Sequence, residues 1–375
     1  MKNLDKVCID RIDEYDVEKI KAVLLKQFAS LGGVEKILEK GKNVVVKPNL
    51  VIRKNPDAAA TVNPAVVEAV CSIFTDAGAD VVIAESSGGL YNQAVMNMTY
   101  KTCGLAKAAE NSGAKLHDDF SEITLYREEN ELCRAFSVIA PIAKADVIID
   151  LCKLKTHTIA TMSGAVKNLF GVIPGIQKVE MHSRFSEVKD FCNMLVDLAL
   201  TVKPTLSVMD AVDAMEGNGP TAGKKTHFGA ILSSFSPFAL DVVAAEIAKI
   251  PFEKVYTLTE AERRGIMKAD IEEVEVIGEL VEKQLKLPDT ADTVLTSLST
   301  IFGGRLRKYL EPKPVINKKL CRGCGECVKN CPMKLITLKD GKPQINRDGC
   351  IHCFCCHELC RFHAVDIKKP FVAKI

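Results

Sequence analysis

The sequence contains no Trp, has no apolar run of about 18 residues and carries a formal net charge of only +2. Without such a run, no segment is expected to form a membrane-spanning helix, and the start, MKNLDKVCIDRIDEYD, is too charged for a signal peptide. A net charge this close to zero indicates neither a nucleic-acid partner nor a membrane surface. No G-x-G-x2-G fingerprint follows an expected strand, so a flavin or nicotinamide cofactor is not indicated. We therefore expect a cytoplasmic protein that binds neither nucleic acid nor membrane.

Cysteine is the residue that the chain has in excess, with 15 among 375 residues. A disulfide framework is typical of small secreted chains, so an odd number of cysteines in a chain of this kind favours metal or redox chemistry. Nine cysteines lie between Cys321 and Cys360, which marks the last part of the chain as different. The other six are scattered singly and are expected to be packing residues: Cys8, Cys71, Cys103, Cys133, Cys152 and Cys192.

Before the cysteine-rich part, apolar runs of strand length alternate with amphipathic stretches of helix length. The runs cover residues 43–46, 80–84, 145–151, 206–209 and 228–232, and the helical stretches cover 64–75, 100–112, 186–202 and 237–249. Near-continuous Val and Ile runs suit strands buried on both faces. This alternation predicts an α/β fold with a mostly parallel sheet and helices on both faces. We place this domain at residues 1–285, a linker at 286–312 and a second, smaller α+β domain at 313–375.

Polar motifs follow the expected strands at the point where each strand ends. They are Lys47-Pro48-Asn49, Glu85-Ser86-Ser87-Gly88-Gly89, the Lys153, Lys155 and His157 group, Asp210, and Ser233-Ser234. In open α/β sheets, ligands bind beyond the carboxyl ends of the strands, although turns after strands are often polar without any ligand. We predict a ligand site at these strand ends, with the following binding residues: Lys47, Asn49, Glu85, Lys153, Lys167 and Asn168.

Residues 153–175 are the densest of these segments. Lys153, Lys155 and Lys167 accompany Ser163-Gly164, which could open a helix. Lysines beside the N-terminus of a helix form an anion pocket, because ammonium and backbone N–H groups converge there. The segment therefore predicts a bound carboxylate or phosphate; a solvated basic turn is the alternative.

A second candidate segment contains Asp210, Asp213 and Glu216 in front of a glycine-rich loop at 217–223. Carboxylates at such a place could hold a cation or act as a general base, or the loop could be a mere connection. We predict that Lys155, His157 and Lys167 hold the anion in the reaction, while Asp210 or Glu216 handles protons, so that Lys155, His157, Asp210 and Glu216 are the candidate catalytic residues.

The cysteine-rich part repeats one spacing. Residues 321–332 read C-x2-C-x2-C-x3-C-P, and the same spacing begins again at Cys350. In two-cluster ferredoxins the fourth cysteine of each run binds the other cluster. Four-cysteine zinc sites instead usually pair two C-x2-C knuckles across a longer spacer. We therefore predict two 4Fe-4S clusters, one held by Cys321, Cys324, Cys327 and Cys360, the other by Cys331, Cys350, Cys353 and Cys356.

Cys355 is a ninth thiol in the same region and makes the register ambiguous. The C-x2-C spacing from Cys353 favours Cys356 as the ligand, which leaves Cys355 spare. Between the two runs, residues 335–338 and 344–345 flank Asp340-Gly341 and predict a β-hairpin.

The charge of this part differs from that of the rest of the chain. Residues 313–370 contain twelve Lys and Arg against five Asp and Glu, while the remaining residues carry 38 basic and 43 acidic side chains. A positive face around the clusters predicts an acidic redox partner, such as a ferredoxin or a flavodoxin-like protein.

With both parts considered, the chain resembles iron–sulfur proteins of the domain-of-unknown-function 362 family. The resemblance rests on KPNL at 47–50, on residues 153–175 and on residues 210–223. It implies an α/β domain followed by a C-terminal two-cluster ferredoxin module. More remotely, Ser163-Gly164 with Lys167 is similar to a turn in nickel-pincer lactate racemases, but the racemase histidine pattern is missing and no activity is implied.

These observations predict an iron–sulfur oxidoreductase that relays single electrons through two clusters to an anionic ligand at the strand ends. One alternative is a non-enzymatic electron carrier or assembly partner whose α/β domain docks another protein. Another is that the clusters are purely structural. Exposed clusters of this type are oxygen-sensitive, so we expect an anaerobic setting.

Overall fold

The computed structural model describes residues 4–290 and 312–368. Its largest element is a nine-stranded sheet, of which eight strands form one path and β8 pairs with β7. In spatial order the strands are β11 (Val274–Gly278), β1 (Asp5–Arg11), β10 (Lys224–Ser234), β9 (Leu206–Glu216), β7 (Val147–His157), β2 (Asn43–Pro48), β3 (Asp80–Ile83) and β4 (Lys115–Leu116), with β8 at Thr161–Ser163. Five of the strand pairs are parallel and three are antiparallel. The predicted mostly parallel sheet is confirmed.

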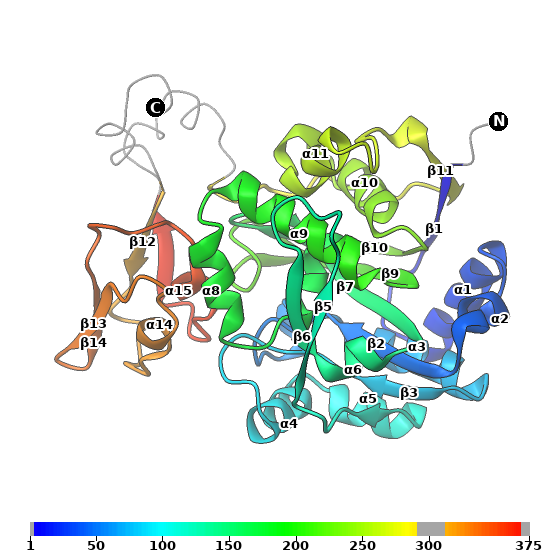
Figure 1. The fold of residues 1–375 in the computed structure, drawn as a ribbon, viewed down its shortest axis with the longest axis horizontal. Coiled ribbons are helices and arrows are strands. Elements are labelled where there is room, and N and C mark those ends of the chain that lie inside the picture. Colours follow the sequence, from blue (N-terminus) through cyan, green and yellow to red (C-terminus); the bar gives the residue numbers. More distant parts are fainter. Residues whose placement is uncertain (1–3, 291–311, 369–375) are drawn as a thin grey trace.

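Helices cover both faces of the sheet, as predicted (Figure 1). Successive side chains of a strand point to opposite faces of the sheet, and in β2 Val44 and Val46 pack on one face while Val45 packs on the other. Both faces are therefore apolar, and both need a layer of helices. The first face carries α1 (Val17–Ser30), α3 (Pro64–Asp76), α4 (Gln93–Thr102) and α5 (Leu105–Ser112). The second carries α6 (Ala140–Lys144), α7 (Ala165–Asn168), α9 (Val188–Val202), α10 (Pro237–Ile247) and α11 (Tyr256–Arg263).

The remaining short elements connect these layers. They are α2 (Val34–Ile37), α8 (Gln177–Arg184), the 3-10 turns η1 (Leu38–Lys40), η2 (Pro56–Ala58), η3 (Leu169–Val172), η4 (Phe252–Lys254) and η5 (Ile271–Glu273), and the hairpin β5 (Glu122–Tyr126) and β6 (Ala135–Ile139). No helix in the described part of the chain is long and apolar enough to cross a membrane.

Two helix starts follow from their first residues. Asn63 caps α3 by accepting from the N–H of Ala65, and Pro64 occupies the first helical position, where its missing N–H costs nothing. Ser236 caps α10 in the same way. The predicted helix at 100–112 is wrong, however. It is split into α4 and α5 because Gly104 adopts φ +78, a left-handed conformation that ends the first helix.

Strand β10 runs antiparallel to both of its neighbours, β1 and β9. Ser234 is therefore paired with Ser207, near the start of β9, and lies at the opposite edge of the sheet from the ends of β2, β3 and β7. The prediction that Ser233-Ser234 belongs with the other strand-end motifs is wrong. Hydrophobic runs do not reveal strand direction, which tertiary pairing decides.

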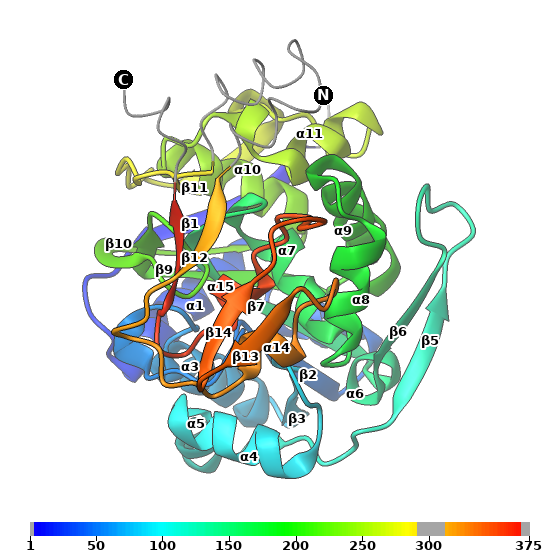
Figure 2. The ribbon, with the colours of Figure 1, turned by 90° about the vertical axis from the view of Figure 1, so that its left-hand side faces the viewer.

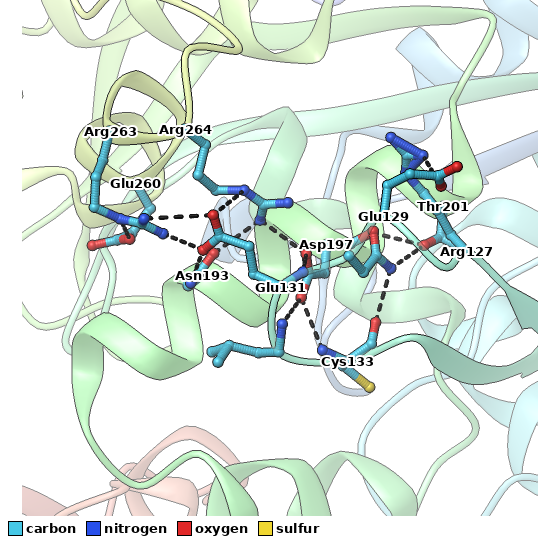
Figure 3. A network of polar contacts seen from close by, with 12 residues as sticks. Arg127, Glu129, Glu131, Cys133, Asn193, Asp197, Thr201, Glu260, Arg263 and Arg264 are labelled. Carbon is cyan, nitrogen blue, oxygen red and sulfur yellow. Dashed lines mark hydrogen bonds and ion pairs between the residues drawn. The ribbon is translucent and has the colours of Figure 1, made fainter.

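Asp197 joins the loop of the β5–β6 hairpin and the end of α11 to α9 (Figure 3). Its buried carboxylate accepts the backbone N–H groups of Glu131, Leu132 and Cys133 at 2.8–3.0 Å. Arg264, just after α11, approaches the same carboxylate at 2.9 Å. The buried carboxylate thus bonds to three N–H groups of the β5–β6 loop and to one guanidinium. These bonds hold the loop and the end of α11 against α9.

The C-terminal part forms a small module of short elements (Figures 1 and 2). They are β12 (Lys313–Ile316), α14 (Glu326–Lys329), β13 (Ile336–Lys339), β14 (Lys342–Ile345), α15 (Cys355–Glu358) and β15 (Val365–Lys368). The predicted hairpin is confirmed as β13–β14, and Asp340 and Gly341 both have positive φ in its two-residue turn. Most of the predicted linker at 286–312 lies outside the described residues, because these exclude 291–311.

Candidate functional site

A cavity with about 730 Å³ of empty volume lies between the C-terminal ends of β2, β3 and β7 and helix α15 of the module. We call this cavity the crevice. Six predicted site residues line it: Lys47, Asn49, Glu85, His157, Lys167 and Asn168. Both views place the module against the body of the α/β part, with α15 on the side that faces it (Figures 1 and 2).

Lys47 and Glu85 form a buried ion pair in the wall of the crevice. Lys47 also donates to the carbonyl oxygen of Pro48 at 3.1 Å. Both side chains are almost completely buried, at 0% and 2% exposure. Because each charge neutralises the other, the pair shapes the wall and leaves little free charge for a ligand.

A chain of amide contacts runs beside this pair. Lys155 donates to Asn49 Oδ1 at 2.7 Å, Asn49 donates to Asn168 at 2.9 Å, and Asn168 donates to Asp150 Oδ1 at 2.8 Å. Lys155 also donates to the carbonyl oxygen of Ala60 and does not line the crevice. Burial above all lowers the pKa of Lys155 well below its usual value. Lys155 therefore lies behind Asn49 and holds its side chain in place.

Lys167 differs from the other lysines of the site. Its ammonium lies 4.7 Å from the ring centre of Phe170 and 5.7 Å from that of Phe191. Within the described ranges it has neither a hydrogen bond nor an ion pair. Burial lowers its pKa, and Glu358 opposes this shift. A cation held among aromatic rings, without an anionic partner, is suited to bind an anion from the crevice.

His157 presents one ring nitrogen to the crevice. Its Nδ1 accepts from the backbone N–H groups of Ile159 at 3.0 Å and Ala160 at 3.3 Å. The proton of a neutral ring must then sit on Nε2. Burial, together with Lys167 and Lys155, lowers the pKa of His157 well below its usual value, which keeps the ring neutral. Nε2–H is therefore a fixed hydrogen-bond donor.

The donor at His157 Nε2 is not satisfied by the protein. Glu358 Oε1 lies 3.5 Å away, and neither atom has a hydrogen-bond partner among residues 4–290 and 312–368. Buried polar atoms are nearly always hydrogen-bonded in native proteins. These two atoms lie 3.5 Å apart in the lining of the crevice, and both remain available to a water or a ligand group there.

Lys178, in the first turn of α8, also lines the crevice and was not predicted from the sequence. Its ammonium donates to the carbonyl oxygens of Ser86 and Ile173, and burial lowers its pKa to about 7. These bonds hold the Glu85–Gly89 turn against the segment that ends at Gly175. The predicted turn does line the crevice, through Glu85, Ser86, Gly88 and Gly89.

Three predicted residues lie away from the crevice. Lys153 and Asp210 are bonded to each other at 2.8 Å, and Tyr15 contacts both. Glu216 accepts from the backbone N–H of Lys286 at 3.1 Å. The Asp210 carboxylate also accepts the backbone N–H groups of Asn63 and Val212. Through its ion pair with Lys153 it links the buried strands β9 and β7.

The expected helix N-terminus does form at α7, but its donors are taken. Asp241 of α10 accepts from the N–H groups of Ala165 at 2.6 Å and Val166 at 3.1 Å. The anion at this terminus is therefore a side chain of the protein. The charge of α7 that faces the crevice is instead that of Lys167, in its last turn.

The module closes the crevice through α15 and the residue after it. Cys355, Glu358 and Leu359 contribute to the lining. The hydroxyl of Thr221 donates to the carbonyl oxygen of Glu358 at 2.8 Å, which ties the glycine-rich loop after β9 to the module. No sequence pattern indicates this wall of the crevice, because it depends on how the two parts pack.

The eight predicted cluster ligands separate into two groups in space. One cavity, of about 360 Å³, is lined by Cys321, Cys324, Cys327 and Cys360. The other, of about 380 Å³, is lined by Cys331, Cys350, Cys353 and Cys356. These are the two crossed sets expected from the spacing, so the cysteines present fit a pair of cubane clusters. In the described chain, no three Cys, His, Asp or Glu side chains converge closely enough to hold a single metal ion.

Backbone donors to the thiols repeat with the same symmetry. The N–H of Leu335 donates to Cys331 Sγ at 3.3 Å, and that of Ala364 donates to Cys360 Sγ at 3.2 Å. The two pairs are 29 residues apart, as are Cys321 and Cys350. Hydrogen bonds to ligand sulfurs are a feature that tunes iron–sulfur clusters.

Comparisons with known proteins agree with this division of the chain. A thylakoid-associated protein of Synechocystis sp. is 29% identical over 299 residues, which cover 76% of this chain and 88% of that protein. An uncharacterized ferredoxin of Methanocaldococcus jannaschii is 38% identical over 56 residues, which cover 14% of this chain and 90% of the ferredoxin. The lactate racemase apoprotein of Thermoanaerobacterium thermosaccharolyticum gives a TM-score of 0.40 at 14% identity, over 67% of this chain and 58% of the racemase.

Two family models match the chain. The model described as 4Fe-4S dicluster domain covers residues 313–361, so the C-terminal module is a ferredoxin-type iron–sulfur domain with a role in electron transfer. The other model covers residues 44–246, which include the crevice residues of the α/β part. More than half of the chain matches it, and the protein belongs to the family described as Domain of unknown function (DUF362).

Proposed function

We propose that the protein is an iron–sulfur oxidoreductase in which single electrons pass from the ferredoxin-type domain to a small anionic ligand bound in the crevice. One observation carries the proposal: the crevice is lined by Lys167 and His157 on one side and by α15 on the other. Helix α15 also contains Cys356, a predicted cluster ligand. The ligand would thus lie against the helix that holds a cluster.

The residues that line the crevice have different roles in binding and reducing the ligand. The Lys167 ammonium binds the anionic group, because it lacks a partner of its own. Asn49 and Asn168, positioned by Lys155, offer further polar contacts. His157 Nε2–H donates a hydrogen bond to the group that gains electron density.

Two 4Fe-4S clusters, when bound, would supply single electrons at low potential. A two-electron reduction of the ligand consumes two such electrons and two protons, and a reduced ferredoxin or flavodoxin-like protein would be the electron source. The module face, with its excess of Lys and Arg, suits an acidic donor of that class.

The test uses anaerobically purified full-length protein with its clusters reduced. Each member of a panel of small 2-oxo and unsaturated carboxylates is mixed with it, and cluster reoxidation is followed by absorbance while products are identified by mass spectrometry. Acetate and inorganic phosphate are titrated calorimetrically, to distinguish a carboxylate site from a phosphate site. We expect acetate or phosphate to bind and at least one panel member to reoxidise the clusters. Persistence of the reduced clusters with every compound, without binding of either probe, would refute the proposal.

A second function, docking of another protein, is favoured by the hairpin β5–β6. It projects from the body of the protein (Figure 2), and Tyr126 on it is 73% exposed. The relative from Synechocystis is described as thylakoid-associated, and association with another structure requires a docking surface. Replacing Tyr126 with Ser should abolish partner capture but leave acetate binding unchanged if docking is the function of this hairpin.

A further inference from the structure

Several polar side chains of the crevice are already bonded within the protein. Lys47 and Glu85 are bonded to each other, and so are Asn49 and Asn168. The Lys178 ammonium donates to carbonyl oxygens. Buried polar groups need a partner, and these side chains have theirs without a ligand. What the crevice demands of a ligand is therefore decided by the groups that have none.

Three groups of the crevice need a partner of one definite kind. The Lys167 ammonium and His157 Nε2–H can only donate, and Glu358 Oε1 accepts. None of the three has a hydrogen-bond partner within residues 4–290 and 312–368, and His157 and Glu358 are only 1% and 8% exposed. Ser163 and His182 also line the crevice, but each can either donate or accept. A ligand that satisfies all three groups must offer two acceptors and one donor.

His157 Nε2 and Glu358 Oε1 lie close enough to bind the same ligand atom. They are 3.5 Å apart, which is longer than the usual hydrogen bond between nitrogen and oxygen. A ligand oxygen placed about 2.8 Å from each atom can accept from the imidazole N–H. It satisfies the carboxylate only if it also carries a hydrogen. The gap between the two side chains therefore suits the oxygen of an O–H group.

Glu358 is otherwise an unfavourable residue for an anion site. Its negative charge repels a bound anion, and juxtaposed like charges cost affinity. The internal repeat of the module contains the opposite charge: a shift of 29 residues relates α14 to α15 and makes Lys329 the counterpart of Glu358. A lysine at this position of α15 would add a second cation near Lys167. A carboxylate favours anion binding only when the anion itself donates a hydrogen bond.

We propose that Glu358 is a specificity-determining residue of the crevice, which selects anions that carry an O–H group over anions that carry none. The inference rests on the anion site of the proposed function. Lys167 binds the negative group, and His157 and Glu358 bind the O–H oxygen between them. The O–H group can be a hydroxyl near a carboxylate or the protonated oxygen of a hydrogen phosphate, and the experiment distinguishes the two.

This selection also bears on the direction of the proposed reduction. Two electrons and two protons convert the C=O group of a 2-oxo carboxylate into CH–OH, so such a ligand gains its O–H group when it is reduced. The crevice then binds the reduced ligand more tightly than the oxidised ligand. By linkage, a difference in affinity of this sign favours reduction of the bound ligand.

The test is a set of calorimetric titrations of anaerobic, full-length holoprotein at pH 8 with two matched pairs of anions. Hydrogen phosphate and sulfate are both dianions, and glycolate and acetate are both monocarboxylates, but only the first member of each pair carries an O–H group. We expect the wild-type protein to bind that member about tenfold more tightly in at least one pair. A preference in the phosphate pair alone identifies a hydrogen phosphate, and one in the glycolate pair alone identifies a hydroxycarboxylate.

Glu358→Gln should reduce this preference to about threefold or less, because its amide N–H can donate to an anion without an O–H group. A general weakening of the site would instead lower both affinities of a pair and leave their ratio unchanged. Glu180→Gln is the control, since it removes the same charge from an exposed position of α8 and should keep the wild-type ratio. If Glu358→Gln fails to load clusters, Glu358→Asp replaces it. Its shorter carboxylate draws the acceptor away from His157, so it should also lose the preference.

Equal affinities within both pairs in the wild-type protein would overturn the inference, and so would an undiminished preference in the folded Glu358 variant. In either case binding of the anions leaves the proposed function standing and removes only the role of Glu358. Failure of all four anions to bind would refute the anion site of the proposed function, and this inference with it.

Discussion

The lysines of the crevice differ in one property that decides their roles, namely whether the ammonium has an anionic partner. Lys47 is paired with Glu85, whereas Lys167 lies against aromatic rings and is attracted by Glu358 without forming an ion pair with it in the described structure. Removing one partner of a buried ion pair leaves the other charge uncompensated, at a cost of about 3–5 kcal/mol. For Lys167 the unfavourable burial of its charge outweighs the attraction by Glu358, so removing this cation carries no such cost. The same substitution at the two positions should therefore give opposite results.

We predict that Lys167→Met weakens anion binding at least tenfold, because a charge-assisted hydrogen bond contributes about 1.5–3 kcal/mol. The free energy of unfolding should stay level or rise. Calorimetric titration with acetate and thermal unfolding measure the two effects. Lys47→Met is the matched comparison and should lower stability by several kcal/mol. Equal stability losses in both variants would contradict this division of roles.

Asp150 provides a pH-dependent prediction. Burial raises its pKa to about 7, against the opposing effects of Lys47, Asn168 and Ser207. In the unfolded chain the pKa of the Asp150 carboxyl is near 3.8. Between about pH 4 and 7 this group therefore binds more protons in the folded protein than in the unfolded protein. Stability from this group is therefore complete below about pH 4 and is lost as the pH rises to about 7.

The variant Asp150→Asn should remove this dependence, because the amide oxygen still accepts from Asn168 without carrying a charge. One pKa unit corresponds to about 1.4 kcal/mol. Between pH 5 and 7, the wild-type protein should thus lose about 2–3 kcal/mol more than the variant. Anaerobic urea unfolding at the two pH values gives the difference. Identical pH slopes would show that Asp150 is not the group responsible.

At the scale of single residues, the sequence predicted side chains that follow strands and missed those brought in by packing. His157 and Lys167 were found because they follow a recognisable buried run. Lys178 and Glu358 were missed, since one lies on a short helix and the other in a different part of the chain. Asp210 was assigned to the site, but pairing with Lys153 holds it elsewhere. Ion pairs between residues far apart in the sequence, such as Lys153 and Asp210, cannot be recognised from a local sequence pattern.

At the scale of elements, the crevice depends on two turns that approach each other closely. A Cβ atom added at Gly175 would overlap the carbonyl oxygen of Gly89, and both residues line the crevice. Backbone cannot rotate away as a side chain can. Overpacking of this kind typically costs about 1–3 kcal/mol.

We predict that Gly175→Ala separates the two turns, lowers the thermal stability and weakens acetate binding. Gly88→Ala is the control, because the nearest atom to its added Cβ is the end of the Leu359 side chain, which can rotate. Thermal unfolding and calorimetric titration compare the two variants. Equal behaviour of both would mean that the close approach of the turns is not what shapes the crevice.

Elements were predictable where a local signal exists. Capping residues and buried valine runs located α3, α10 and β2. Strands β7 and β9 extend several residues beyond the predicted ends, because their polar residues pair within the protein and not with solvent. The direction of β10 follows from hydrogen bonds to β1 and β9, which no short-range pattern encodes.

At the scale of the whole molecule, positive charge collects on the C-terminal module while the rest of the chain is acidic. Cys324 is exposed, and the loop before it presents Lys318, Lys319 and Arg322 to solvent. Charge around a redox centre raises the rate at which an oppositely charged partner arrives. We therefore expect an acidic electron donor to dock at this loop.

We predict that Lys319→Glu combined with Arg322→Glu slows reduction of the clusters by an acidic flavodoxin or ferredoxin about tenfold at low ionic strength. The effect should shrink as salt increases, because the Debye length falls to about 10 Å at 0.1 M. Stopped-flow absorbance measures the rate constants over a salt series. Lys36→Glu with Lys40→Glu changes the net charge by the same amount on exposed residues of the α/β part. If both double variants slow reduction equally, net charge and not the module loop governs the encounter. A selective effect at the loop would place electron entry at the Cys324 face, beside the cavity lined by Cys321, Cys327 and Cys360.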